Sequence, residues 1–161
     1  MTETLKARLE KSGFAPDLKA RTKRDVLREL ADLLVSGGEI SADAADDVFK
    51  ALVEREDKMS TGMQFGVAIP HAKTDKARGL IAAVAVCRDG IDFKSMDGQP
   101  SNIFIVTISP PTDAGVHIRF LADISRFLAS RTVRERVLAA TTKDEMVAAF
   151  FGDSGAPDAG A

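Results

Sequence analysis

Two apolar runs of strand length constrain the fold of this chain most strongly. Leu80–Cys87 and Ile103–Ile108 both lack charged residues. Such runs are typical of strands covered on both faces, because a strand with one wet face alternates apolar and polar residues. Asp89-Gly90 follows the first run and is a strong hairpin signal, so we expect at least one antiparallel pair. The runs therefore predict an α/β fold, with a mixed sheet flanked by helices on both faces.

A helix with a clear apolar stripe is predicted ahead of these runs. The stripe extends over Val26–Leu34, and the opposite face is charged. Thr22 and Asp25 have the spacing of a capping box, and Gly37-Gly38 supplies a stop. This segment is the most strongly patterned helix of the chain.

A second helix is predicted from Ser41, its cap, to about Glu56. Its apolar stripe continues onto Arg55, and a buried guanidinium needs a partner. Two interpretations stay open. Arg55 either snorkels outward near the helix C-terminus, or points its fork at an anion held near the segment 60–71.

A third helix follows Pro110-Pro111, with Thr112 or Asp113 as its cap, and this places His117 in its first turn. Apolar residues cover most of its circumference. We therefore expect a largely buried helix with a narrow polar stripe formed by Arg119, Asp123 and Arg126.

The two ends of the chain are patterned differently. Capping-box pairs at Thr132/Glu135 and Thr142/Glu145 predict two short helices near the C-terminus. Residues 1–21 are weakly patterned and cannot be placed. The Gly-, Ala- and Pro-rich composition from residue 152 onward predicts disorder. We expect one domain over residues 1–151 and a disordered tail over 152–161.

Composition excludes several classes of protein. With 161 residues, 45% hydrophobic and 29% charged, the chain can bury a full core as one domain. A net charge of −2 gives no electrostatic reason to expect nucleic acid or an anionic membrane as partner. The single cysteine, Cys87, excludes an intrachain disulfide and is best interpreted as a small core residue. Because no apolar run reaches signal-core or membrane-spanning length, we expect a soluble, cytoplasmic protein.

The segment Ser60–Lys73 carries the first candidate functional group. Val67–Ile69 is predicted to be a short buried strand, which must end at Pro70 because proline cannot donate to a ladder. His71 would then be the first residue past the strand, on a stiffened backbone, and residues 72–79 would form a short helix or loop. Such a histidine is a candidate for chemistry, although an ordinary hydrogen-bonded loop histidine is the alternative.

The second of the two histidines, His117, also follows an apolar strand. Ligands gather at strand ends in α/β sheets, so His71 and His117 could converge. A helix N-terminus disfavours an imidazolium and welcomes an anion. This pattern suits a neutral histidine that accepts a phosphoryl group, with a second imidazole and an arginine around the oxygens. The alternative for His117 is a locally bonded histidine at a helix start.

Other chemistries lack their motifs in this sequence. No H-E-x-x-H pattern supplies zinc ligands, no G-x-S-x-G elbow supplies a hydrolase serine, and no phosphate-binding P-loop is present. We therefore predict neither a metal nor another cofactor.

At these residues the sequence resembles enzyme IIA of the bacterial phosphotransferase system, in the fructose, mannitol and nitrogen-regulatory family. The motif consists of Arg55-Glu56, then Ser60-Thr61-Gly62, then Gly66-Val67-Ala68-Ile69-Pro70-His71. A second block begins at Val116-His117. The resemblance covers roughly Leu18 to Phe151.

The resemblance implies specific roles for four residues. His71 would take a phosphoryl group from an HPr-type phosphocarrier protein and pass it to a IIB partner. His117 would hydrogen-bond the phosphoryl oxygens, Arg55 would neutralise their charge, and Thr61 would contact the site. A nitrogen-regulatory protein, whose phosphorylation state controls binding to other proteins, is the alternative within the family. Outside it, the histidines could be structural or metal-binding.

One position departs from the family pattern. Many members carry Asn where this chain has Phe65. Asn offers hydrogen bonds to backbone or ligand, whereas Phe offers only an apolar ring. An exposed Phe65 beside His71 would favour an apolar docking patch for a partner protein.

Overall fold

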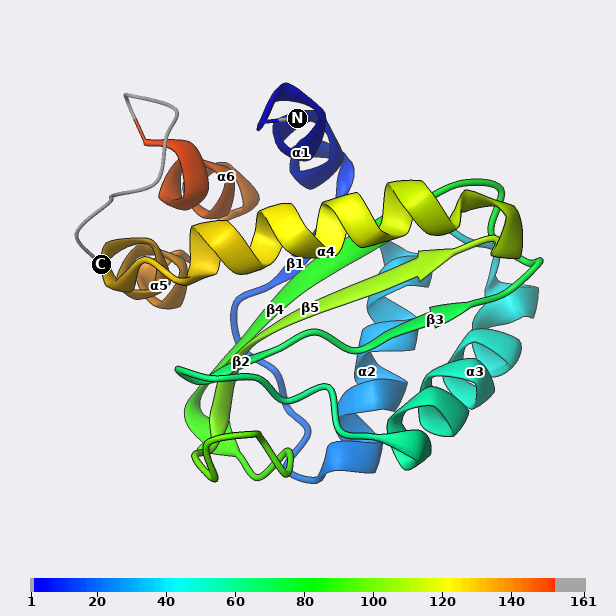
Figure 1. Cartoon of the computed structure of the whole chain (residues 1–161), viewed down its shortest axis with the longest axis horizontal. Helices are drawn as coiled ribbons and strands as arrows, with labels where there is room; N and C mark the ends of the chain where they lie inside the picture. Colours follow the sequence, from blue (N-terminus) through cyan, green and yellow to red (C-terminus); the bar gives the residue numbers. More distant parts are fainter. Residues whose placement is uncertain (1, 153–161) are drawn as a thin grey trace.

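Five strands form one mixed sheet within residues 2–152, the part of the chain that the computed structural model describes (Figure 1). The strand order is β1 (Gly13–Ala15), β4 (Ile81–Ile91), β5 (Ser101–Ser109), and then β2 (Val67–Ala68) and β3 (His71–Lys73), which both pair with β5. The pair β4–β5 is antiparallel and the other pairs are parallel. The predicted mixed sheet is therefore confirmed. The predicted tail, apart from Gly152, lies outside the described residues.

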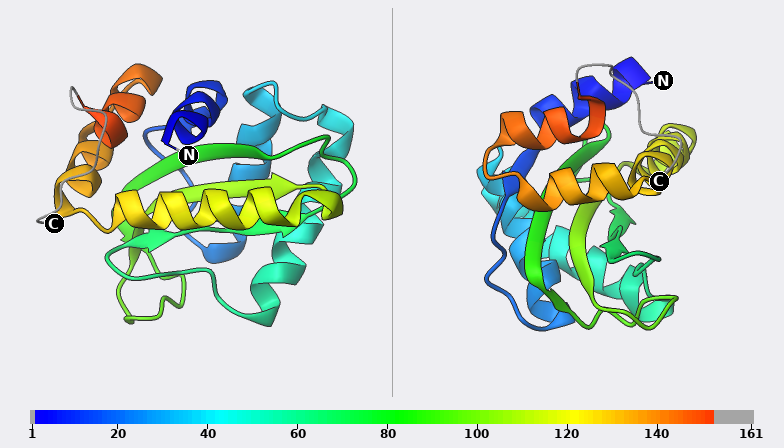
Figure 2. Two further views of the ribbon diagram at one scale, coloured as in Figure 1. Left: turned by 45° about the horizontal axis from the view of Figure 1, so that its top comes forward. Right: turned by 90° about the vertical axis from the view of Figure 1, so that its left-hand side faces the viewer.

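Helices cover both faces of this sheet, as predicted. One layer consists of α2 (Lys23–Ser36) and α3 (Ala45–Lys58). The other consists of α1 (Thr2–Lys11), α4 (Ala114–Leu128), α5 (Arg131–Ala139) and α6 (Lys143–Phe151). Two views turned from that of Figure 1 show the layers on either side of the strands (Figure 2).

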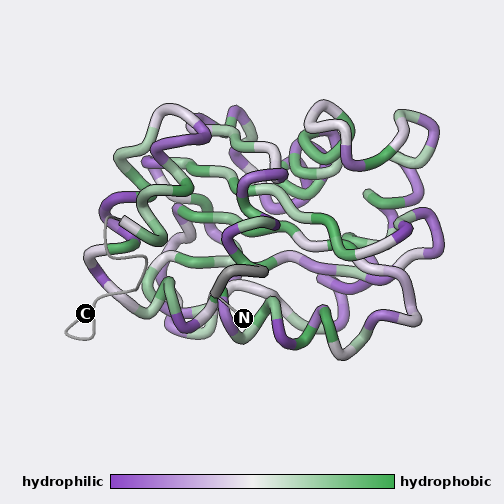
Figure 3. The backbone as a smooth tube through the Cα atoms, turned by 90° about the horizontal axis from the view of Figure 1, so that it is seen from above, coloured by the Kyte–Doolittle hydropathy of each residue, from purple (hydrophilic) through white to green (hydrophobic). Residues whose placement is uncertain are grey.

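The long strands divide their side chains between two cores, which explains the continuous apolar runs. In β4, Ala83, Ala85 and Cys87 face the α2–α3 layer. Ala82, Val84 and Val86 face the other layer, in accordance with the period of two in a strand. Hydrophobic segments accordingly follow the strands in the middle of the molecule (Figure 3).

The predicted start of the first helix is correct, whereas the predicted start of the second is not. The Thr22 hydroxyl accepts a hydrogen bond from the Asp25 N–H at 3.2 Å, so the cap of α2 is confirmed. Ser41 instead precedes a short 3₁₀ turn, Ala42–Ala44, without a side-chain cap, and α3 begins only at Ala45. The 3₁₀ turn tightens the entry to the helix, a common arrangement at helix N-termini.

The hairpin prediction at Asp89-Gly90 was wrong. Strand β4 continues to Ile91, and residues 92–100 connect it to β5. The register shifts between Val86, opposite Ile103, and Ile91, opposite Ser101. The bulged residues are held by the Asn102 amide, which donates to the carbonyls of residues 87 and 88 at 3.1 Å each. Gly90 supplies a φ of +80°, so the glycine serves a bulge rather than a turn.

Further expectations need correction. The weakly patterned N-terminus contains α1, whose Leu5 and Leu9 are buried, and the strand β1. Helix α4 is buried on one side only, because it packs on the sheet while Val116 and Ile118 remain 53% and 67% exposed.

The polar stripe predicted for α4 also differs, since Asp123 is buried and lies 3.9 Å from Arg126. Helix α5 is capped by Ser130, whose hydroxyl accepts from the Val133 N–H, and not by Thr132. The Thr142 cap of α6 is confirmed.

Candidate active site

His71 begins strand β3 and is held by pairing with β5. Its partner in the parallel register is Thr107, whose N–H donates to the Pro70 carbonyl at 3.0 Å. The expectation of a short helix or loop directly after His71 was therefore wrong for Ala72 and Lys73, which continue β3. Pro70 interrupts the edge strand because it has no N–H, but pairing resumes at the next residue. The imidazole is thus carried by the sheet itself.

A backbone carbonyl sets the protonation of the His71 ring. Nδ1 lies 2.8 Å from the Ile69 oxygen, which can only accept, so Nδ1 carries the hydrogen. The lone pair of Nε2 is therefore free. Burial is the largest effect on the pKa of His71 and lowers it from its usual value, so the ring is neutral near pH 7. A neutral imidazole with an unprotonated Nε2 is a competent nucleophile.

His117 lies against His71, and their predicted convergence is confirmed. The ring centroids are 5.5 Å apart and the planes are perpendicular. His117 is buried, with Nε2 2.7 Å from the Thr107 hydroxyl and Nδ1 2.8 Å from the Ser109 hydroxyl. Burial, with a smaller effect of His71, lowers its pKa to about 4. Both imidazoles are consequently uncharged at neutral pH.

Arg55 bonds to the end of its own helix and also lines the His71 cavity. Its Nη1 donates to the Met59 carbonyl at 2.7 Å, which ties down the end of α3. The side chain also lines the same cavity as His71, a space of about 430 Å³. Lys94 is a second cation in its wall. Two cationic side chains beside a neutral imidazole can hold an anion of phosphoryl size.

Ser60 and Thr61 form another wall of this cavity, and Gly62 follows them in the chain. The Ser60 hydroxyl donates to the Phe93 carbonyl at 2.6 Å. A Cβ on Gly62 would lie 2.8 Å from the Cα of Ser95, so only glycine fits there. Thr61 is buried and its hydroxyl donates to Glu56 at 2.5 Å, so that hydroxyl is already engaged within the protein.

Sequence reasoning missed Glu56 as part of the site. The available signal was its place in the motif directly after Arg55, but its burial could not be read from that position. Its carboxylate accepts hydrogen bonds from the Thr61 N–H and the Thr61 hydroxyl, and it pairs with Lys23 at 2.9 Å.

Comparison with known proteins decides the family. The family model described as "Phosphoenolpyruvate-dependent sugar phosphotransferase system, EIIA 2" matches residues 8–151. The chain belongs to this family. Members transfer phosphoryl groups between proteins, in accordance with the resemblance seen in the sequence.

Relatives within the EIIA 2 family are of two kinds. The chain is 38% identical over 122 residues to the PTS system fructose-specific EIIA component of Haloferax volcanii, covering 76% of this chain and 78% of that one. It is 33% identical over 127 residues to a nitrogen regulatory protein of Bradyrhizobium diazoefficiens, covering 79% and 81%. The crystal structure of nitrogen regulatory protein IIA-Ntr from Neisseria meningitidis matches with a TM-score of 0.78 and 26% identity, covering 87% and 94%.

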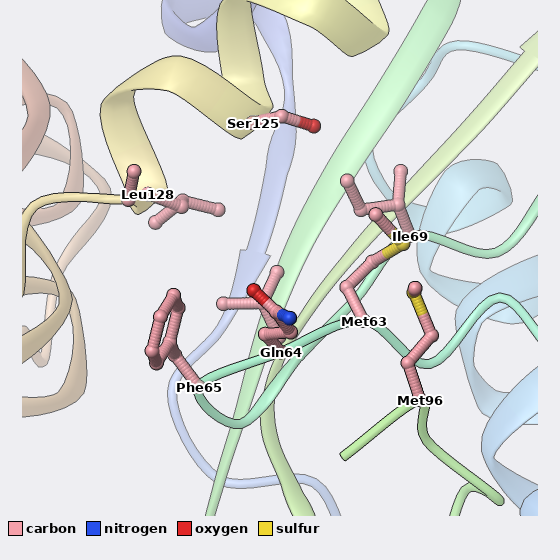
Figure 4. Close-up of a pocket in the computed structure, with 9 residues that line it drawn as sticks. Met63, Gln64, Phe65, Ile69, Met96, Ser125 and Leu128 are labelled. Atoms are coloured by element: carbon pink, nitrogen blue, oxygen red, sulfur yellow. The ribbon is translucent and has the colours of Figure 1, made fainter.

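An apolar pocket adjoins the His71 cavity of this EIIA protein. It measures about 260 Å³ and shares four residues with that cavity, Ser125 and the apolar Met63, Ile69 and Met96. Figure 4 shows the three apolar side chains close together, with Phe65 and Leu128 at the other side of the pocket. Phe65 is 59% exposed, and Met96 is 72% exposed. The surface beside His71 is therefore largely apolar.

The backbone at Phe65 adds a second difference from the Asn that the resemblance led us to expect at this position. Phe65 has a φ of +63°, in the left-handed region that Asn adopts more readily than most residues. The departure thus concerns backbone conformation as well as hydrogen bonding.

Two negative observations complete the description of residues 2–152. No group of three or more His, Cys, Asp or Glu side chains in this part of the chain is arranged to hold a metal ion. None of its helices has the length and apolar character needed to span a membrane.

Proposed function

We propose that the protein is a phosphohistidine carrier, in which His71 accepts a phosphoryl group from an HPr-type phosphocarrier protein and passes it to a IIB partner. The observation that carries this proposal is the hydrogen bond from His71 Nδ1 to the Ile69 carbonyl, because it leaves Nε2 unprotonated on a ring that lines a cavity with two cationic side chains. Membership of the EIIA 2 family supports the same assignment.

The transfer needs no base at His71. The Nε2 lone pair forms the new bond to phosphorus while the donor N–P bond breaks, and the donor nitrogen keeps the electron pair of that bond. The hydrogen stays on Nδ1 and remains hydrogen-bonded to the Ile69 carbonyl, which stabilises the positive charge that develops on the ring. Onward transfer to IIB is the same step in reverse, with the IIB nucleophile as acceptor.

Arg55 and His117 have supporting roles in this proposal. Arg55 neutralises the phosphoryl oxygens from the cavity wall. A ring N–H of His117 turns from the Thr107 hydroxyl to a phosphoryl oxygen. The low pKa of His117 keeps its ring uncharged while it does so. Thr61 shapes the wall, and the apolar surface around Phe65 and Met96 is the docking patch for the partner protein.

Labelling with a phosphorylated donor protein tests the proposal. We expect His71→Ala to abolish acid-labile labelling. We expect His117→Ala to accept the label but to pass it to a IIB protein more slowly. The chain has only two histidines, so the double variant gives the background. Undiminished labelling of His71→Ala would overturn the assignment.

The nitrogen-regulatory branch is a second candidate, favoured by the relatives from Bradyrhizobium and Neisseria. In that case phosphorylation of His71 would control binding to a regulatory protein. The two candidates differ in the fate of the label: rapid transfer to a IIB protein supports the carrier, and binding that depends on phosphorylation without transfer supports the regulator.

A further inference from the structure

We propose that Glu56 and Thr61 are positioning residues that hold His71 in its reactive tautomer. The inference rests on the proposed role of His71 as phosphoryl acceptor and adds to it two residues that act through the backbone of Ile69. It starts from one buried carboxylate and follows four hydrogen bonds to the nucleophile.

The first step is the pairing of Glu56 with Thr61. Glu56 lies at the end of α3 and is only 6% exposed. Its Oε2 accepts the Thr61 N–H at 2.7 Å, and its Oε1 accepts the Thr61 hydroxyl at 2.5 Å. A buried carboxylate is costly unless its oxygens are satisfied, and charged acceptors form strong hydrogen bonds. Thr61 is therefore fixed at both its backbone and its side chain.

The second step joins Thr61 to the residue that contacts the imidazole. The Thr61 carbonyl accepts the Ile69 N–H at 3.0 Å, and the Ile69 carbonyl accepts the His71 Nδ1–H at 2.8 Å. The next residue, Pro70, has no N–H, so the peptide that carries the Ile69 carbonyl has no donor of its own to anchor it. The orientation of this carbonyl depends on how firmly Ile69 itself is held.

Lys23 allows Glu56 to act without charging the imidazole. An unpaired carboxylate near His71 would favour the imidazolium, which cannot attack phosphorus. Lys23 Nζ lies 2.9 Å from Oε2 and balances that charge. The ion pair thus anchors the Thr61 segment while His71 stays neutral.

The experiment observes the tautomer directly. Long-range ¹H–¹⁵N NMR spectra at pH 7.5 distinguish the protonated from the unprotonated nitrogen of His71. We expect Nδ1–H alone in the unaltered protein and a mixture of tautomers in Glu56→Ala and Thr61→Val. In these variants the maximal rate of phosphoryl acceptance should fall roughly tenfold, the effect of losing about one such interaction, while the donor KM stays unchanged.

Two control variants separate positioning from stability. Thr61→Ser keeps the hydroxyl and should restore the single tautomer and the rate. Glu39→Gln removes a partly buried ion pair with Arg8, 3.2 Å long, and should leave both readouts unchanged. If Glu56→Ala does not fold, Thr61→Val, which retains the Thr61 N–H bond, takes its place.

The outcomes are distinct. A single Nδ1–H tautomer and an unchanged rate in Glu56→Ala and Thr61→Val would overturn the inference, even if both variants lose stability. Failure of the unaltered protein to be phosphorylated at His71 would overturn the proposed function instead, and the NMR spectra would still show whether Glu56 and Thr61 set the tautomer.

Discussion

The guanidinium of Arg134 lies 4.5 Å from the centre of the Phe65 ring, so the start of α5 is joined to the segment that leads to His71. Arg134 is itself held by the carbonyls of Leu128 and Ala129 at 2.9 Å each. Phe65 meanwhile has the left-handed backbone that disfavours most side chains. The cation–π contact therefore offsets part of a conformational cost.

The first prediction compares two replacements of Phe65. Phe65→Asn and Phe65→Ala both lose the ring and its contact with Arg134. Only Asn tolerates the left-handed conformation, so we expect it to be more stable than the Ala variant by roughly 1 kcal/mol. Urea unfolding of the two variants measures this difference. An Ala variant as stable as the Asn variant would contradict it.

The second prediction concerns stability at mildly acid pH. The pKa of His117 is about 4 in the folded protein and 6.5 in the unfolded chain. Between these values the unfolded chain binds a proton that the folded protein does not. This contribution to stability is therefore complete above pH 6.5 and is lost as pH falls toward 4, by at most about 1.4 kcal/mol per pH unit.

Chemical unfolding at pH 7, 6 and 5, roughly spanning this window, tests that prediction. His117→Gln removes the group, so its unfolding free energy should fall less steeply with decreasing pH than that of the unaltered protein. Parallel pH profiles for the two proteins would show that His117 is not the residue responsible.

The third prediction concerns Arg55 in the two phosphorylation states. Arg55→Ala loses the bond to the Met59 carbonyl in both states, but it loses the proposed contact with phosphoryl oxygens in only one. The phosphorylated form should therefore be destabilised by roughly 1.5 kcal/mol more than the unmodified form. Thermal unfolding of both forms gives the comparison. Lys58→Ala, an exposed cation outside the cavity wall, should affect both forms equally. Equal losses for Arg55→Ala in the two states would count against the role of Arg55.

The fourth prediction distinguishes two candidate caps of α5. Ser130 is buried and accepts the Val133 N–H at 3.3 Å, so Ser130→Ala should cost about 1 kcal/mol of unfolding free energy. Thr132 lies inside the helix, so Thr132→Ala should change stability by less than about 0.5 kcal/mol. A larger loss of stability in Thr132→Ala than in Ser130→Ala, measured by denaturant titration, would support Thr132 as the cap.

The elements predicted correctly are those whose pattern is local. The apolar runs of β4 and β5 and the stripe and cap of α2 are visible within a dozen residues. The bulge at Gly90 was mistaken for a turn because the difference depends on Asn102, which is distant along the chain. Helix α1 was missed because its buried face depends on packing against α4 and α6, which the N-terminal sequence does not reveal.

The candidate site shows the same division. His71 and His117 stand out because histidine is rare in this chain and both follow apolar strands. That His71 pairs with β5 could not be foreseen, since it requires Thr107 to lie alongside. Glu56 is buried only because Lys23 and Thr61 meet it from other segments, and a carboxylate in a helix is ordinarily solvated.

The backbone of His71 is fixed by its pairing with β5, so the proposed reacting nitrogen can move only a little. A donor or acceptor protein must therefore bring its own group to His71. The exposed apolar groups beside it, Met63, Phe65 and Met96, lie instead on connecting segments between the strands. We therefore expect substitutions in these segments to change which protein docks while the geometry around His71 stays the same.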